Sequence, residues 1–256
     1  MDEIARFNKS RWEALAKAQV EFSCPMLNLT TETARALVDE RGLLGDLTGK
    51  HVLCLASGGG QQSAAFGLLG AQVTVVDLSE TQLQRDRAAL THYRLSGTLI
   101  QGDMRDLSRL GAQSFDVVWH AFSINFVPDA GIVFDQVRRV IRSGGLYRLQ
   151  WSNPFAVGVD ETNWNGQGYT VGRHYRNGEI EFDSQSQYWE FPDSAGVTRK
   201  IEGPREFNHT LSTVINGLIA REFALLGLWE VETNELNVTP GTWAHLLSVL
   251  PKDVSS

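Results

Sequence analysis

Apolar and polar positions follow two different periods along residues 51–151. Five short apolar runs have the length of buried β-strands, at residues 51–56, 72–76, 98–101, 115–119 and 146–151. Three intervening segments, at residues 61–69, 80–94 and 131–141, repeat their apolar positions at the spacing of an amphipathic helix. Strands that alternate with such helices pair in parallel, with helices on both faces of the sheet. The pattern therefore predicts a doubly wound, mostly parallel α/β fold.

The segments on either side of this region have other patterns. Residues 9–22 and 31–38 are helical in spacing, so we expect residues 1–48 to form an N-terminal helical lid. Residues 208–256 are expected to complete the core, with a helix over 211–226 and a strand that starts near Leu228. Ser143, Gly144 and Gly145 follow the helix expected at 131–141 and are expected to end it, because glycine adopts the left-handed conformation of a helix C-cap.

Residues 152–207 lack helical periodicity and are rich in Gly, Asn, Asp, Gln and aromatic residues. We expect this segment to be an inserted, β-rich cap over the substrate. Its pair Asn177–Gly178 is typical of a two-residue hairpin turn, which would place Tyr175 opposite Ile180. The chain is thus divided into 1–48, a cofactor-binding core at 49–151, the cap at 152–207 and the C-terminal part at 208–256.

The stretch from His51 to Asp77 has the order strand, tight turn, helix, strand and carboxylate. The turn Ser57-Gly58-Gly59-Gly60 lets the backbone approach a ligand without a Cβ in the way. Asp77 ends the second strand, where a ribose would lie in a parallel βαβ unit. Such a unit binds an adenosine-containing cofactor, and its spacing alone fits NAD and S-adenosylmethionine equally well.

Composition narrows the class of protein. With 256 residues, 42% of them hydrophobic and 21% charged, the chain has the profile of a globular enzyme. A net charge of -7 argues against a nucleic-acid partner, which calls for a basic face. Cys24 and Cys54 form no CxxC pair, so we predict neither a metal site nor a disulfide. No apolar run is long enough to span a membrane, so the cytoplasm is the expected location, and the sequence leaves open whether the protein forms an oligomer.

Three further motifs follow the glycine turn in register: Gly102-Asp103-Met104, Phe115-Asp116-Val117-Val118-Trp119 and Arg142-Ser143-Gly144-Gly145-Leu146. Together the four motifs resemble the class I S-adenosylmethionine-dependent methyltransferases, in particular the small-molecule branch of the ubiquinone- and menaquinone-biosynthesis type. The resemblance covers about residues 49–151. It implies a seven-stranded Rossmann-like sheet, S-adenosylmethionine as the cofactor, and methyl transfer to an O, N, S or C nucleophile of a small organic molecule by in-line displacement.

The resemblance also implies which residues bind the cofactor. The glycine turn would lie under the methionine part, the acid after the second strand would bind the ribose hydroxyls, and the acid after the third strand would meet the adenine. The residues at these positions are Ser57, Gly58, Gly60, Asp77, Leu78, Asp103 and Met104, with His120 as a further cofactor contact.

The sequence departs from the family pattern at two positions. Cys54 stands where the pattern has an acid, and Ala56 stands where it has the first of three alternating glycines. These departures keep open the alternative of a cofactor-binding protein without catalytic activity. An NAD-dependent oxidoreductase is a second alternative, disfavoured because Ser63 occupies the position of the third glycine of the NAD fingerprint.

Candidate catalytic and substrate-binding residues lie near the expected carboxyl ends of the strands, where ligands of open α/β sheets bind. A methyl acceptor that must lose a proton needs a general base, and His120 and His209 are the candidates. Aromatic side chains would suit an apolar, aromatic or amine-bearing substrate. The substrate-binding candidates are Trp12, Phe122, Trp164, Tyr169 and Tyr175.

Overall fold

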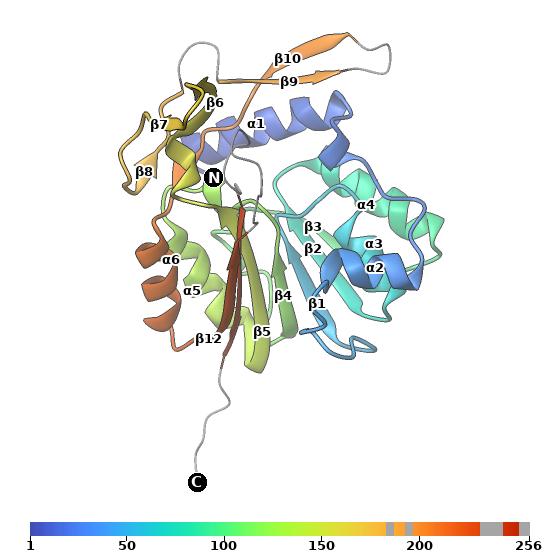
Figure 1. Ribbon diagram of the computed structural model, residues 1–256. Helices are drawn as coiled ribbons and strands as arrows, with labels where there is room; N and C mark the ends of the chain where they lie inside the picture. The colour runs from blue at the N-terminus through green and yellow to red at the C-terminus, as the bar shows by residue number, and fades with distance from the viewer. Residues whose placement is uncertain (183–186, 193–196, 231–242, 251–256) are drawn as a thin grey trace.

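A seven-stranded sheet forms the centre of the molecule (Figure 1). The computed structural model describes residues 1–182, 187–192, 197–230 and 243–250. The strands of the sheet, in spatial order, are β12 (Ala224–Glu230), β13 (Trp243–Val249), β5 (Ile141–Ser152), β4 (Phe115–His120), β1 (His51–Leu55), β2 (Gln72–Asp77) and β3 (Gly97–Gln101). β1 to β5 pair in parallel, and β13 runs antiparallel between β5 and β12. The doubly wound, mostly parallel α/β fold is confirmed.

Helices cover both faces of this sheet, and α5 and α6 lie on the opposite face from α2 and α3 (Figure 1). The helices are α1 (Glu3–Lys17), α2 (Thr31–Val38), α3 (Gln62–Leu68), α4 (Glu80–His92), α5 (Ala130–Val140) and α6 (Leu211–Ile219), with short 3-10 turns η1 (Glu21–Ser23), η2 (Ile124–Phe126) and η3 (Ala156–Gly158). Among the described residues, no helix is long and apolar enough to cross a membrane.

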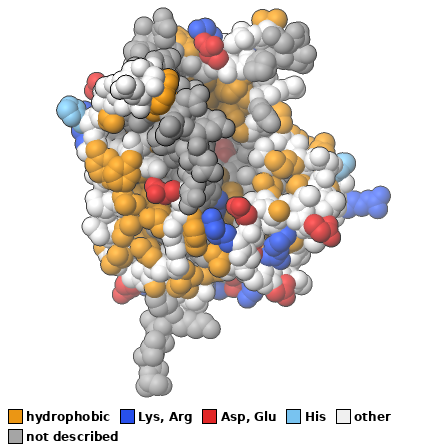
Figure 2. Space-filling view, viewed as in Figure 1, with side chains coloured by type: hydrophobic (Ala, Val, Ile, Leu, Met, Phe, Trp, Pro, Cys, Tyr) orange, Lys and Arg blue, Asp and Glu red, His pale blue; other side chains and the backbone are white. Residues whose placement is uncertain are grey.

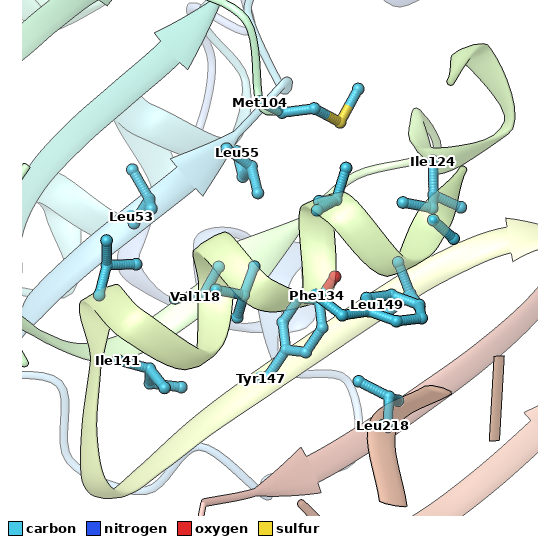
Figure 3. Close-up of a cluster of buried hydrophobic side chains, with 14 of the residues drawn as sticks. Leu53, Leu55, Met104, Val118, Ile124, Phe134, Ile141, Tyr147, Leu149 and Leu218 are labelled. Atoms are coloured by element: carbon cyan, nitrogen blue, oxygen red, sulfur yellow. The ribbon is translucent and has the colours of Figure 1, made fainter. Parts of the chain in front are cut away.

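Two hydrophobic cores follow from this layering. On one face, Phe134 of α5 and Leu218 of α6 pack over Tyr147 and Leu149 of β5 (Figure 3). On the other face, Phe66 of α3 packs with its ring edge-on to Trp119 of β4. Successive strand residues point to opposite faces, so each buried strand supplies both cores. The two central strands β1 and β4 are therefore buried along most of their length.

The described residues between β5 and α6, the segment expected to form the cap and called the cap below, contain three two-stranded sheets. They pair β6 (Val159–Trp164) with β7 (Tyr169–Val171), β8 (Gly178–Glu179) with β11 (Phe207–Asn208), and β9 (Tyr188–Pro192) with β10 (Thr198–Glu202). In Figure 1 the β9–β10 ribbon lies beside α1, above the end of the central sheet. An ion pair of 2.7 Å between Arg11 of α1 and Glu202 of β10 links the two. On the face in Figure 2, Lys and Arg side chains are interspersed with Asp and Glu.

Three local expectations prove wrong. The helix expected over 211–226 ends at Ile219, and the chain turns back at Glu222, which has a φ of 67°, into β12. Gly144 does not cap a helix: it lies inside the long strand β5, and its N–H donates to the carbonyl of Leu250. Asn177–Gly178 makes no hairpin: Gly178 and Glu179 pair with Asn208 and Phe207, and the Asn177 side chain accepts hydrogen bonds at the start of α6.

Candidate functional site

A cavity of about 670 Å³ opens at the carboxyl ends of the parallel strands and extends up to α1 and β9. This is the end of the sheet at which open α/β folds bind ligands. One half of the cavity is bordered by the loops after β1, β2 and β3. The other half is bordered by aromatic side chains of α1, η1, η2 and β9. A single space therefore offers a polar and an aromatic compartment side by side.

The polar half contains most of the residues that the sequence points to. Its lining includes Ser57, Gly58, Asp77, Leu78, Asp103 and Met104, all of which are expected cofactor contacts. Gln82 of α4 also lines it, and its buried Oε1 has no hydrogen-bond partner among the described residues. A buried polar atom is normally paired, so an unpaired acceptor on a residue that lines a cavity is a candidate to bind a donor of a ligand.

The backbone amides of the glycine turn are bonded to carboxylates of the protein. Gly58 N–H donates to Asp77 Oδ2 at 3.0 Å, Gly59 N–H to Asp86 Oδ2 at 3.1 Å and Gly60 N–H to Asp86 Oδ1 at 3.0 Å. Ser63 Oγ, in the first turn of α3, donates to the same Asp86 carboxylate at 2.5 Å. The turn is thus held by two carboxylates: Asp77 at the end of β2, which also lines the cavity, and Asp86 of α4, which does not.

Burial of these carboxyl groups changes their acidity. Burial raises the pKa of Asp77 to about 6, although the amides of Ser79 and Gly58 favour its ionised form. Burial raises the pKa of Asp86 to about 7, against the effect of its bonds to Ser63, Gly59 and Gly60. The two groups repel each other as anions. Ionised, they make the region behind the turn electronegative, which suits a cationic ligand and opposes an anionic one.

The aromatic half is a network of rings in edge-to-face contact. Trp12 of α1 lies 6.1 Å from Phe22, 5.0 Å from Phe126 and 5.8 Å from Trp189, measured between ring centroids. Phe191 of β9 lies 5.6 Å from Phe22. Trp189 and Phe191 alternate with Glu190, whose side chain is turned toward Lys200 on β10 at 2.5 Å. This half therefore presents an apolar surface that α1 and the cap build together.

Side chains of α4 hold the N-terminal segment over the polar half. The Arg85 guanidinium donates to the carbonyls of Ala16 and Ser23, and the Glu13 carboxylate accepts from Thr81. At the other end of α1, Arg105 binds Asp2 at 2.7 Å and Asp103 at 2.7 Å. These two acids raise the pKa of Arg105 further, and Arg105 holds the pKa of Asp2 well below its usual range.

The structure brings eight of the expected site residues to the cavity: Ser57, Gly58, Asp77, Leu78, Asp103, Met104, Trp12 and Phe122. Gly60 is not among the residues that line it. A Cβ at Gly60 would meet the Arg85 carbonyl oxygen at 2.6 Å, so the missing side chain makes room for α4. The φ of Gly60, +78°, is also one that glycine adopts without strain.

Neither candidate histidine lines the cavity, contrary to expectation. His120 is 0% exposed, because β4 turns its side chain into the core, where Nδ1 lies 2.8 Å from the Tyr147 hydroxyl. Burial lowers the pKa of His120 to about 3, and the charge of Arg148 adds to the shift. His209 Nε2 lies 3.1 Å from the carbonyl oxygens of Ile124 and Val127, and burial lowers its pKa. His209 thus braces the loop after β4, whereas His120 bonds to β5 inside the core.

Three cap aromatics also lie away from the cavity. Trp164 and Tyr169 pack on each other in the β6–β7 hairpin, with ring centroids 5.1 Å apart. Tyr175 is 48% exposed and stacks on Phe155 at 4.8 Å, and its hydroxyl accepts from the Leu211 N–H. The cap does contribute aromatic rings to the cavity, but they come from β9.

Sequence reasoning missed several residues of the site, among them Gln82, Asp86, Trp189 and Phe191. A signal for Asp86 exists, because Leu83, Asp86 and Leu90 share one face of a helix and a lone acid on an apolar stripe is unusual. Tyr188-Trp189-Glu190-Phe191 likewise has the alternation of a half-buried strand. Among the described residues no group of three His, Cys, Asp or Glu could hold a metal ion.

Comparison with known proteins places this architecture in a family. The domain described as "Methyltransferase domain" matches residues 53–149. YbaJ, described as a methyltransferase of Bacillus subtilis, is 34% identical over 186 residues, which are 72% of this chain and 69% of YbaJ. A ubiquinone biosynthesis O-methyltransferase of Pseudomonas syringae is 35% identical over 111 residues, 42% of this chain and 45% of that enzyme.

Solved structures share the fold at lower identity. The CcbJ methyltransferase of Streptomyces caelestis aligns with a TM-score of 0.64 at 16% identity, covering 98% of this chain and 100% of that one. An S-adenosylmethionine-dependent methyltransferase of Clostridium acetobutylicum aligns with a TM-score of 0.62 at 14% identity, covering 94% and 96%. The sheet order, the cavity at its carboxyl edge and the sequence relatives agree: the chain belongs to the class I S-adenosylmethionine-dependent methyltransferases.

Proposed function

We propose that the chain transfers the methyl group of S-adenosylmethionine to a small, largely apolar acceptor that binds among the rings of Trp12, Phe22, Phe122, Phe126, Trp189 and Phe191. The observation that carries this proposal is the continuity of the polar and aromatic halves in one cavity. A cavity of this size and lining is typical of small-molecule sites. The net charge of -7 also favours a small acceptor over a nucleic acid. Cys24 and Cys54 are both free, which fits the reducing cytoplasm.

The polar half fits S-adenosylmethionine better than a dinucleotide. A pyrophosphate requires backbone amides that point at it, whereas the amides of Gly58, Gly59 and Gly60 are donated to Asp77 and Asp86. The ionised carboxylates behind the turn attract a sulfonium and an ammonium group and repel a phosphate. This contrast, together with membership of the family, decides against the NAD-dependent oxidoreductase.

Within this half, each side chain would contact a different part of the cofactor. Asp77 would accept from the ribose hydroxyls, and Asp103 would accept from the adenine amino group through lone pairs left by its bonds to Arg105. Gln82 would present its unpaired Oε1 to a donor of the cofactor. Leu78 and Met104 supply apolar contact for the adenine ring.

When bound, S-adenosylmethionine would supply a methyl group carried on a sulfur that is a good leaving group. The chain has mainly to align the two partners and to exclude water. α1, tied to α4 through Arg85 and Glu13, covers the reacting centre. The rings of the other half orient the acceptor and keep the site dry.

Calorimetric titration tests the cofactor, and a product screen by mass spectrometry with a panel of amines, thiols, phenols and carboxylic acids tests the reaction. We expect S-adenosylhomocysteine to bind and NAD not to bind, and one acceptor class to gain 14 mass units. Binding of NAD in preference would contradict the cofactor assignment. Binding of S-adenosylhomocysteine without turnover on any acceptor would favour the non-catalytic alternative.

Two cap tryptophans give a matched pair for the acceptor site. Trp189→Ala removes a ring that lines the cavity, whereas Trp164→Ala removes one from the β6–β7 hairpin. Loss of a buried aromatic contact should raise the KM for the acceptor by roughly tenfold in Trp189→Ala, with cofactor affinity unchanged. We expect Trp164→Ala to retain the parent KM. Equal effects on KM in the two variants would contradict the proposal that β9 forms part of the acceptor site.

A further inference from the structure

Asp86 lies outside the four sequence motifs that carry the family resemblance. It lies on α4, 0% exposed, and its two carboxylate oxygens accept from Gly59 N–H, Gly60 N–H and Ser63 Oγ. One side chain therefore fixes two consecutive amides of the glycine turn and the first turn of α3. None of the residues that carry the family resemblance does this.

The position of Asp86 bears on the residue that is missing at 54. Cys54 stands where the family pattern has an acid, and burial together with the charge of Asp86 raises the pKa of its thiol. The negative charge behind the turn thus comes from α4 instead of β1. The turn also differs from the pattern at Ala56, which adopts a φ of 47°.

The conformation of the turn depends on this support. Gly59 and Gly60 have φ values of 122° and 78°, which glycine adopts without strain, and both of their amides donate to Asp86. Without Asp86 these two buried N–H groups would lose their acceptor and turn toward water or another acceptor. Gly58 would move with them, and with it the edge of the cavity that faces Gln82, whose Oε1 is unpaired and lies in the same lining.

We infer that Asp86 is a positioning residue that holds the cofactor turn, residues 57–60, in the form that binds S-adenosylmethionine, and so takes the place of the acid absent at position 54. The inference rests on the proposed cofactor site and deepens it. Asp86 does not line the cavity, so it acts through the turn and not by touching the ligand.

The test compares variants of one helix by calorimetric titration of S-adenosylhomocysteine. We expect Asp86→Ala to weaken binding at least tenfold. Asp86→Asn keeps one acceptor oxygen and should lose less. Leu90→Ala, a buried position on α4 remote from the turn, serves as the control for lost stability, and Gln84→Ala, an exposed one, as the control for the helix surface. Both controls should bind like the parent.

A local readout separates positioning from general loss of structure. In the parent, the amide protons of Gly59 and Gly60 should resonate downfield in an NMR spectrum, as amides bonded to a carboxylate do. In Asp86→Ala both signals should move upfield. In Leu90→Ala and Gln84→Ala they should stay where they are in the parent. If the parent binds and Asp86→Ala binds within twofold of it, or if Leu90→Ala loses as much affinity, the inference is overturned. If the parent itself does not bind, the proposed cofactor site fails instead.

Discussion

Asp77 and Asp86 show how much of the site rests on single ionisable groups. Asp77 accepts from Ser79 N–H at 2.8 Å and Gly58 N–H at 3.0 Å, and it also lines the cavity. Burial nevertheless raises its pKa to about 6, and the nearby Glu13 adds to the shift. In the folded protein Asp77 therefore titrates close to neutral pH, well above its pKa in an unfolded chain.

Cofactor affinity should depend on pH through this group. Only the ionised Asp77 can accept from two ribose hydroxyls, so protonation competes with binding below the pKa of about 6. We expect affinity for S-adenosylhomocysteine to fall by up to about tenfold per pH unit as pH decreases below 6. Asp77→Asn should bind about tenfold to a hundredfold more weakly at pH 8.

The pH profile of Asp77→Asn provides the control. Calorimetry from pH 5 to 8 should give a shallower profile for this variant, with the remaining slope coming from Asp86, whose pKa is raised to about 7. An unchanged profile would mean that Asp77 does not meet the cofactor in its ionised form.

Ala56 carries a conformational cost that the sequence alone does not reveal. Its φ of 47° lies in the left-handed region, where an alanine Cβ crowds the following carbonyl. Ala56→Gly should therefore raise the free energy of unfolding by roughly 0.5–1 kcal/mol. Ala36→Gly, at an exposed position within α2, should instead lower it by about 1 kcal/mol. Chemical denaturation measures both, and a loss of stability in Ala56→Gly would contradict the strain.

At the scale of elements, α4 and α6 both make side-chain contacts with segments that are distant in the sequence. α4 supplies Gln82, Asp86 and Arg85 to the cavity, the turn and the N-terminal segment. α6 begins at an N-cap, Thr210, that Asn177 of the cap supports. Asn177 Oδ1 accepts from Thr210 N–H at 2.8 Å and from Thr213 Oγ1 at 3.0 Å.

Asn177→Ala should therefore destabilise the start of α6. Loss of the two hydrogen bonds should reduce the free energy of unfolding by about 1–2 kcal/mol, while cofactor affinity stays the same because Asn177 is remote from the cavity. Arg176→Ala, at the exposed neighbouring position, is the matched control and should be neutral. If Asn177→Ala is as stable as the parent, the Asn177–Gly178 turn does not support α6.

Over the whole molecule, buried groups with opposite charge preferences make stability depend on pH. Burial raises the pKa of Glu206 to about 7, partly offset by Arg173, so the folded state holds a proton that the unfolded state releases. Stability from such a group is complete below the unfolded pKa and is lost as pH rises through the folded one. His120 and His209 have lowered pKa values, so they cost stability as pH falls through about 6.5.

An unfolded histidine is half protonated at pH 6.5, so His120 and His209 add stability as pH rises from 6.5 to 8, but they do so equally in the parent and in Glu206→Gln. Their contribution therefore cancels when the two proteins are compared. Over this range the free energy of unfolding of the parent should fall by roughly 1 kcal/mol relative to that of Glu206→Gln, because the variant lacks the raised pKa of Glu206. Urea denaturation at pH 6.5, 7.25 and 8 measures the difference. The same slope in both proteins would show that Glu206 keeps an ordinary pKa.

The sequence by itself determined the core of the fold and the polar half of the site. Short apolar runs, amphipathic helical patterns and the glycine turn are local features of the sequence, so residues 51–77 predict β1, α3 and β2 to within a residue or two. Asp77 and Asp103 can be identified because they follow the expected ends of strands. The family resemblance then supplied the order of motifs from which the cofactor could be inferred.

Only the tertiary structure decided which side chains meet. Successive residues of a strand point to opposite faces, so a shift of one position changes where a side chain lies. His120 therefore lies in the core, while Ala121 and Phe122 line the cavity. Asn177 and Thr210, Arg85 and Ala16, and Trp12 and Trp189 are contacts between segments that no local period relates. The contact of Asp86 with the cofactor turn has the same origin. Its hydrogen bond to Gly60 spans 26 residues and depends on how α4 packs against the turn, which local sequence spacing does not predict.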